Sequence, residues 1–357
     1  MTNSSVERPH EPPSQREEGD RLGVLVGGSS YFHPREQRVA FSIDLFDLDR
    51  DRMQTIPADF LAHGFSTHPA RAHIAALFEK RGPGACIVDL AEAKLLQPIQ
   101  ASSDRAFYGH GAFSPDGAHL YAVEIRTDTH AGLITVRDVP TLRQRDEFPT
   151  YGENPHDCVL LEDKRTLVIT NGGGDLRSKL DPSVTFVDIP SRKLLERIVL
   201  SDPKINAGHV AVTKRGDIAV LSAPRDGLPE LTSLGGVTLR TGKRKPDRMK
   251  SPSSITSRMV GESLSVAIHE PSQVVAATSP YGNLLTFWHL DRKKLLKSFD
   301  LESVRGVTLS LDQRFFIVTY GQGARLLIAT DTLDIVPGSE RITGRFTGSH
   351  VYTWRSS

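Results

Sequence analysis

The chain has 357 residues, and its 44 Lys and Arg against 43 Asp and Glu leave a formal net charge of only +1. This balance argues against a protein that binds nucleic acid or an anionic membrane through general positive charge. No run of residues approaches the roughly 18–20 apolar residues of a membrane-spanning helix, so none is expected. Thirteen histidines are the one unusual feature of the composition.

Residues 1–20 are polar, include three prolines and contain no apolar segment of the kind found in an export signal. We expect them to form a disordered tail. Residues 21–357 are expected to form a single domain whose first strands are Leu22–Val26, Arg38–Leu45 and Met53–Ile56. As written, the chain would be cytoplasmic.

The most informative stretch is Tyr108-Gly-His-Gly-Ala-Phe-Ser-Pro-Asp-Gly117, because imperfect copies of it recur along the chain. A glycine lets the backbone approach a neighbour closely, an apolar strand begins after it, and a tight turn with Pro and Gly ends the strand. The equivalent positions, called the ring positions below, are His63, His110, His156, His209, Ser265, Gly306 and His350. They are 41 to 56 residues apart, and a repeat of this length made of short strands is typical of a β-propeller.

A second repeated feature follows the same spacing. Short apolar strands end in Asp at Asp47, Asp89 and Asp188, and similar strands such as Lys94–Ile99 and Lys193–Ile198 come after them. Two features in a constant phase are harder to obtain by chance than one, so we interpret the repeat as real.

The two ends of the chain complement each other. Gly348–Trp354 resembles an inner strand with no partners after it, whereas the N-terminal region supplies three strands with no inner strand before them. We therefore predict an all-β fold, a seven-bladed β-propeller whose ring is closed by N-terminal strands pairing with the C-terminal strand. Closure removes exposed sheet edges, which otherwise promote aggregation.

The inner strands of a propeller line its central channel, so equivalent positions lie on one ring around the axis. Five ring positions are histidine and are the predicted metal ligands: His63, His110, His156, His209 and His350. Imidazole suits zinc, copper and iron, and Ser265 and Gly306 would leave an open side. Tyr108 and Glu124 are predicted to contact the metal-binding histidines without binding the metal themselves. The alternative is structural: each ring bonds a neighbouring blade, and repeat duplication explains their recurrence.

Signals for catalysis are weak. The chain has no GxSxG or HExxH motif, and no catalytic residue is predicted. We prefer a non-catalytic protein that binds a transition metal or a small polar ligand. One alternative is a lactonase-like hydrolase, with a histidine base and a metal or Arg305 polarising the carbonyl. Another is a protein-interaction scaffold that uses the basic loop Arg240–Lys250.

Four segments carry a family resemblance: Phe107–Gly117, Asn154–His156, Val168–Gly173 and Thr278–Pro280 resemble the bacterial DUF1513 family. The resemblance runs from about residue 22 to the end of the chain, and it supports His110 and His156 as family motif residues. It implies a seven-bladed propeller of the YVTN/lactonase-like kind. It also implies export to the periplasm by the twin-arginine route, although this chain lacks that signal, and a protein partner in an imelysin-type iron-uptake system.

Overall fold

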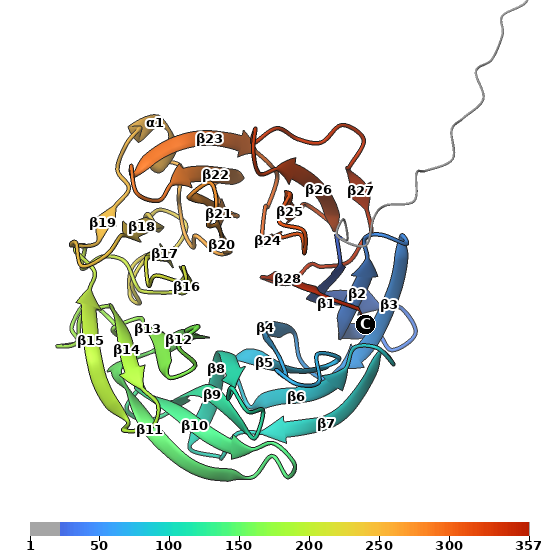
Figure 1. Ribbon diagram of the computed structural model, residues 1–357, viewed down its shortest axis with the longest axis vertical. Coiled ribbons are helices and arrows are strands. Elements are labelled where there is room, and N and C mark those ends of the chain that lie inside the picture. Colours follow the sequence, from blue (N-terminus) through green and yellow to red (C-terminus); the bar gives the residue numbers. More distant parts are fainter. Residues whose placement is uncertain (1–21, 357) are drawn as a thin grey trace, which may run out of the picture.

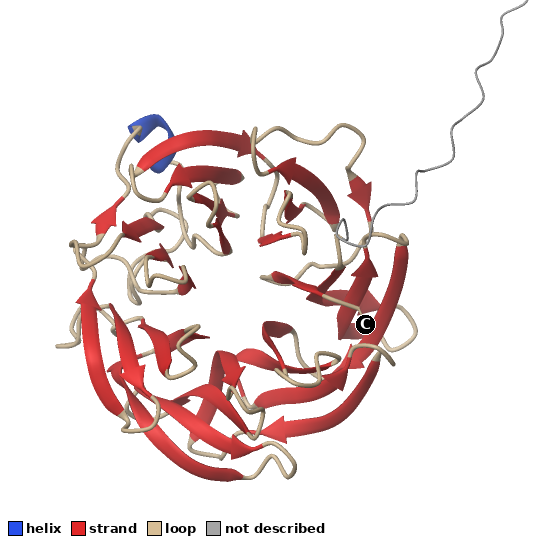
Figure 2. Cartoon of the chain, viewed as in Figure 1, coloured by secondary structure: helices blue, strands red, loops and turns tan. Residues whose placement is uncertain are grey.

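The computed structural model describes residues 22–356, and the tail predicted at residues 1–20 lies outside this range. Within the described residues the regular structure is almost entirely β-strand, and the single helix is α1 (Ser253–Thr256). The all-β prediction is confirmed. The sheets are arranged around a central axis (Figure 1), with loops at their ends (Figure 2). No helix in this range is long and apolar enough to cross a membrane.

Every strand pairing between neighbours in these sheets is antiparallel. The first four-stranded sheet has the order β28 (Val351–Trp354), β1 (Val24–His33), β2 (Arg38–Asp47), β3 (Arg52–Ala58). An eight-stranded sheet contains β4 (Ala62–Thr67), β5 (Ile74–Gly82), β6 (Gly84–Asp89), β7 (Lys94–Gln100), β8 (Arg105–Phe113), β9 (His119–Arg126), β10 (Ala131–Asp138) and β11 (Gln144–Glu153). Its two halves join where β5 pairs with β8, with Lys80 opposite Tyr108 and Gly82 opposite Phe107.

The other four sheets have four strands each, in chain order. The third contains β12 (Pro155–Leu160), β13 (Thr166–Asn171), β14 (Ser183–Asp188) and β15 (Lys193–Val199); the fourth contains β16 (His209–Val212), β17 (Ile218–Ser222), β18 (Gly236–Arg240) and β19 (Asp247–Arg248). The fifth contains β20 (Val266–His269), β21 (Val274–Ser279), β22 (Leu284–His289) and β23 (Lys294–Asp300); the sixth contains β24 (Gly306–Leu309), β25 (Phe315–Tyr320), β26 (Ala324–Ala329) and β27 (Arg341–Ile342).

The apolar core lies between adjacent sheets. Second strands such as β13 are buried along their whole length, because both of their faces are covered, whereas outer strands such as β15 expose most residues. One apolar cluster joins Val26 and Ile43 of the first sheet to Leu77 and Val88 of the next, together with Trp354. Each such side chain contributes about 1.5–3 kcal/mol when fully buried, so contacts between neighbouring sheets hold the arrangement together.

The last strand belongs to the sheet of the first strands. β28 pairs with β1 over four residues, from Val24 opposite Trp354 to Gly27 opposite Val351. The indole Nε1–H of Trp354 donates to the carbonyl of Ala72 at 2.7 Å. These contacts link the C-terminal segment to two neighbouring sheets.

Deletion of residues 348–357 is therefore expected to prevent soluble folding. It removes the buried side chains of Val351 and Trp354 and exposes the edge of β1. The losses are a large fraction of the roughly 5–15 kcal/mol that typically stabilise a protein. Soluble yield and a thermal unfolding curve measure the effect, with deletion of residues 355–357, which leaves β28 intact, as the control. A deletion of 348–357 that unfolds like the control would contradict this role for β28.

Candidate metal centre

The ring positions all fall at the inner ends of sheets. His63 and His156 are the second residues of β4 and β12, and His209 is the first residue of β16. His110 lies within β8, and His350 immediately precedes β28. The repeat position therefore has the same structural place in each sheet, although the sheets are far apart in sequence.

Local backbone irregularities place three of these histidines. The pairing register shifts between Ala62 and Gly64, between Phe107 and Gly111, and between Pro155 and Cys158, so the histidine of each segment lies at the shift. Such bulges redirect a side chain out of the regular alternation of a strand. Gly109 has a φ of +118°, and a Cβ there would lie 2.7 Å from the His63 ring. Only glycine allows this approach without strain.

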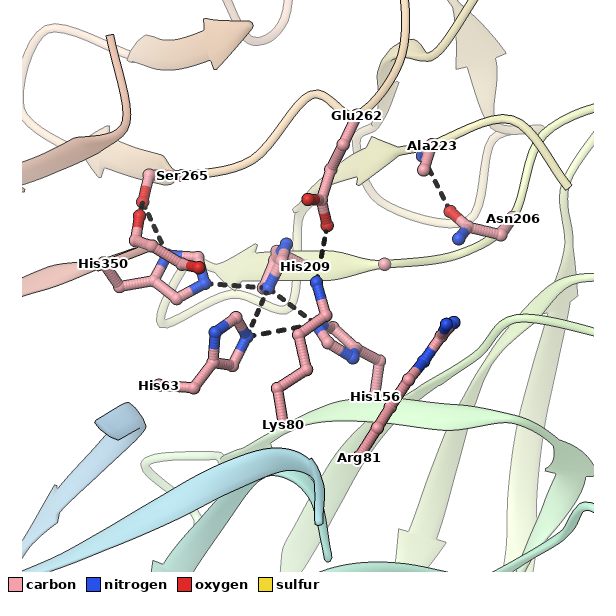
Figure 3. A network of polar contacts seen from close by, with 12 residues as sticks. His63, Lys80, Arg81, His156, Asn206, His209, Ala223, Glu262, Ser265 and His350 are labelled. Atoms are coloured by element: carbon pink, nitrogen blue, oxygen red, sulfur yellow. Dashed lines mark hydrogen bonds and ion pairs between the residues drawn. The ribbon is translucent and has the colours of Figure 1, made fainter. Parts of the chain in front are cut away.

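The five histidines, called the histidine cluster below, are buried and converge. Figure 3 shows four of them, His63, His156, His209 and His350. The Nε2 atom of His209 lies 2.7 Å from Nε2 of His156, 2.8 Å from Nε2 of His350 and 3.2 Å from Nε2 of His63. His63 and His156 are 3.3 Å apart at the same atoms. The His110 ring is centred 4.9 Å from the His63 ring, and its Nε2 is buried with no hydrogen-bond partner.

Hydrogen bonds between the rings do not account for this arrangement. An imidazole nitrogen carries either one proton or one lone pair in the ring plane, so Nε2 of His209 can satisfy one of its three nitrogen neighbours. Metal–nitrogen bonds of about 2.0–2.1 Å place two ligand nitrogens about 2.9 Å apart at octahedral angles and about 3.3 Å apart at tetrahedral angles. The observed separations fall around these values. The cluster could therefore hold a metal ion, and four of its members, His63, His110, His209 and His350, offer ligand atoms within 4.8 Å of one another.

Polar contacts at Nδ1 orient two of the rings. The Ser265 hydroxyl donates to the carbonyl of Ser349 at 3.3 Å, so it accepts from the Nδ1–H of His350 at 2.5 Å. Nδ1 of His110 lies 3.2 Å from a carboxylate oxygen of Asp157, whose other oxygen accepts the Val210 N–H at 3.0 Å. These contacts put the protons on Nδ1 and leave the Nε2 lone pairs facing the cluster, as in known carboxylate–histidine–metal arrangements.

Burial keeps the rings neutral. It lowers the pKa of His63, His156, His209 and His350 well below the ordinary value of 6.5, and the repulsion that protonated rings would exert on one another lowers it further. Burial also lowers the pKa of His110, although the Asp157 carboxylate partly opposes this. Neutral imidazole is the form that binds metal ions, so the cluster is ready for ligation at pH 7.

Of the other predicted site residues, Tyr108 lies beside the histidine cluster and Glu124 does not. The Tyr108 ring is edge-on to His156, with centroids 5.9 Å apart, so it lies beside the cluster. Glu124 is buried within its sheet, where it accepts hydrogen bonds from Arg137 at 2.8 Å and Thr135 at 2.7 Å rather than supporting a histidine.

Arg305 lies close enough to His350 for its charge to lower the pKa of that imidazole. Its Nε donates to the carbonyl of Gly348 at 3.1 Å. This bond holds the side chain against the backbone and does not favour the carbonyl-polarising role of the hydrolase alternative.

Three charged residues at the centre were missed from the sequence: Lys80, Asp157 and Glu262. Asp157 directly follows His156, and this adjacent pair is the one signal that could have indicated it. Lys80 and Glu262 occupy no repeated position. With Arg81, Tyr108 and His156 they line a cavity of about 210 Å³, called the charged cavity below.

The basic loop Arg240–Lys250 is partly neutralised within the chain. Arg240 pairs with Glu196, and Arg248 pairs with Asp202. These ion pairs tie the loop to the neighbouring sheet, which weakens the case for a scaffold that binds acidic partners there.

The chain is thus a propeller-like all-β protein that carries a buried histidine cluster. The family model described as "Protein of unknown function (DUF1513)" matches residues 56–343, and the chain belongs to this family, which confirms the resemblance noted in the sequence. No match was found among curated proteins.

Two solved structures are similar to this chain in fold. Hydrazine synthase of Kuenenia stuttgartiensis has a TM-score of 0.64 and 16% identity, covering 91% of this chain and 100% of that one. The dihydro-heme d1 dehydrogenase NirN in complex with DHE has a TM-score of 0.60 and 14% identity, covering 96% and 78%. At these identities the likeness concerns the fold alone.

The neutral cluster predicts a pH dependence of stability for the metal-free protein. Because the histidine pKa values are lower in the folded state than in the unfolded chain, the unfolded chain binds more protons once the pH falls to the ordinary value of 6.5 and below. The free energy of unfolding should be level above about pH 6.5 and fall below it, by up to about 1.4 kcal/mol per pH unit for each proton.

Urea unfolding of chelator-treated protein between about pH 5.5 and 8 measures this slope. Replacing His63 and His156 together by Gln should reduce the slope, whereas His119→Ala, outside the cluster, should leave it unchanged. Equal slopes in all three proteins would show that the cluster does not cause the dependence.

Proposed function

We propose that this protein binds one transition-metal ion per chain through His63, His110, His156, His209 and His350, and that it acts as a binding protein rather than an enzyme. The observation that carries the proposal is the position of the His209 Nε2 atom, which faces three other Nε2 atoms at 2.7–3.2 Å. Hydrogen bonding satisfies one of these contacts, whereas a shared cation satisfies all of them.

The donor set narrows the choice of ion. Imidazole nitrogens suit divalent zinc, copper, iron and nickel. The two cysteine thiols are not expected to bind the metal. Burial raises the pKa of Cys86 to about 12 and that of Cys158 well above its ordinary value, so neither supplies a thiolate at neutral pH. A divalent ion is therefore favoured over copper(I), and ferrous iron fits the link to iron uptake that the family resemblance implies.

We also propose that the sheets form a closed ring of seven blades. We take the eight-stranded sheet as two blades, β4–β7 and β8–β11, which makes seven blades in a single domain, with the ring closed by the pairing of β28 and β1. The pairing of four residues between these strands supports closure. Inner strands around one axis account for the meeting of the five histidines and Ser265 from distant parts of the chain.

Metal titration tests the function. Chelator-treated protein should bind about one equivalent of Zn²⁺, Cu²⁺ or, without oxygen, Fe²⁺, as measured by calorimetry and elemental analysis. His209→Ala and His110→Ala should weaken metal binding at least about tenfold, because each removes a proposed ligand of the ion. His119→Ala and His289→Ala, outside the cluster, are the controls. Wild-type protein that takes up none of these ions would leave the histidines a purely structural role.

A further inference from the structure

An ion pair spans the charged cavity next to the histidine cluster. Lys80, near the end of β5, and Glu262, in the loop before β20, meet at 2.9 Å between Nζ and Oε1 (Figure 3). Their side chains are 30% and 23% exposed, so both are largely withdrawn from solvent. The two residues come from sheets far apart in the chain and meet beside His156 and His209.

Glu262 lies within reach of the cluster. One of its carboxylate oxygens and the ligand nitrogens of His156 and His209 all lie within 4.8 Å of one another. Two ligands on opposite sides of one metal ion are about 4 Å apart, so this spacing is close to that of a shared coordination sphere. The glutamate side chain has three rotatable bonds, so its carboxylate can change position without a change of the backbone.

The charge of a divalent ion in the histidine cluster would attract the Glu262 carboxylate. The neutral imidazoles bring no negative charge to a divalent ion, and the Asp157 carboxylate stands behind His110 rather than at the ion. The Lys80 ammonium adds positive charge close by. Burial is the main cause that lowers the pKa of His63, His110, His156 and His350, and the Lys80 charge lowers it further. A buried, uncompensated dication is costly, so a carboxylate ligand would stabilise it strongly.

We propose that Glu262 is a ligand of the bound metal ion and that Lys80 holds it away from the cluster in the metal-free protein. The inference rests on the proposed function of the histidine cluster. Metal binding exchanges the Lys80–Glu262 ion pair for a bond from the Glu262 carboxylate to the ion. The released ammonium remains in the charged cavity, where water solvates it.

The exchange predicts opposite effects for the two partners. Glu262→Gln keeps the shape of the side chain but loses its charge, and should weaken metal binding at least about tenfold. Lys80→Met removes both the competitor for Glu262 and a repelling charge, and should strengthen metal binding severalfold. An ion pair that only joins two sheets would instead leave metal affinity unchanged in Glu262→Gln, whereas loss of the repelling charge strengthens binding by Lys80→Met in either case. Glu230→Gln is the matched control, because Glu230 lines the same cavity but is exposed.

Zn²⁺ affinity of the full-length variants, measured by competition with a chromophoric chelator, separates the outcomes. Weaker binding by Glu262→Gln and tighter binding by Lys80→Met support the proposal. Wild-type affinity in Glu262→Gln overturns it while leaving the histidine site intact, and absence of zinc from the wild type overturns the proposed function itself. If Glu262→Gln fails to fold, unchanged or weaker binding by Lys80→Met overturns the exchange.

Discussion

The constraint on which the site depends is the limited bonding capacity of one nitrogen atom. Nε2 of His209 faces the Nε2 atoms of His63, His156 and His350, and a neutral ring can satisfy one of them. Nδ1 of His350 is hydrogen-bonded to Ser265, and Nδ1 of His110 lies beside the Asp157 carboxylate. For these two histidines the structural and functional interpretations are therefore compatible: Nδ1 anchors the ring to its surroundings, and Nε2 remains for a ligand.

The repeated fold delivers these atoms to one place. Each sheet presents an equivalent position at its inner end, and the sheets surround a common axis, so residues at this position approach one another (Figure 1). Register shifts around His63, His110 and His156, together with Gly109, aim the rings inward. Burial then keeps the imidazoles neutral, which is the state that ligation needs.

Sequence periodicity predicted the all-β class and the five histidines, because both repeat with a constant phase. It did not predict Lys80 or Glu262, since each occurs once, outside the repeated position, and they meet only through the arrangement of sheets. The surroundings of Glu124 likewise follow from strand pairing, which sets it opposite Leu133 and beside Arg137. Charged residues outside the repeat can be identified as partners only from the three-dimensional packing.

The X-ray absorption spectrum of the zinc-loaded protein shows whether the histidine cluster holds the ion, because it reports the atoms bound to the metal. We expect a shell of nitrogen and oxygen atoms at about 2.0–2.1 Å, with outer scattering from at least three imidazole rings. A shell of oxygen atoms without imidazole scattering would contradict this, because the metal would then lie outside the histidine cluster.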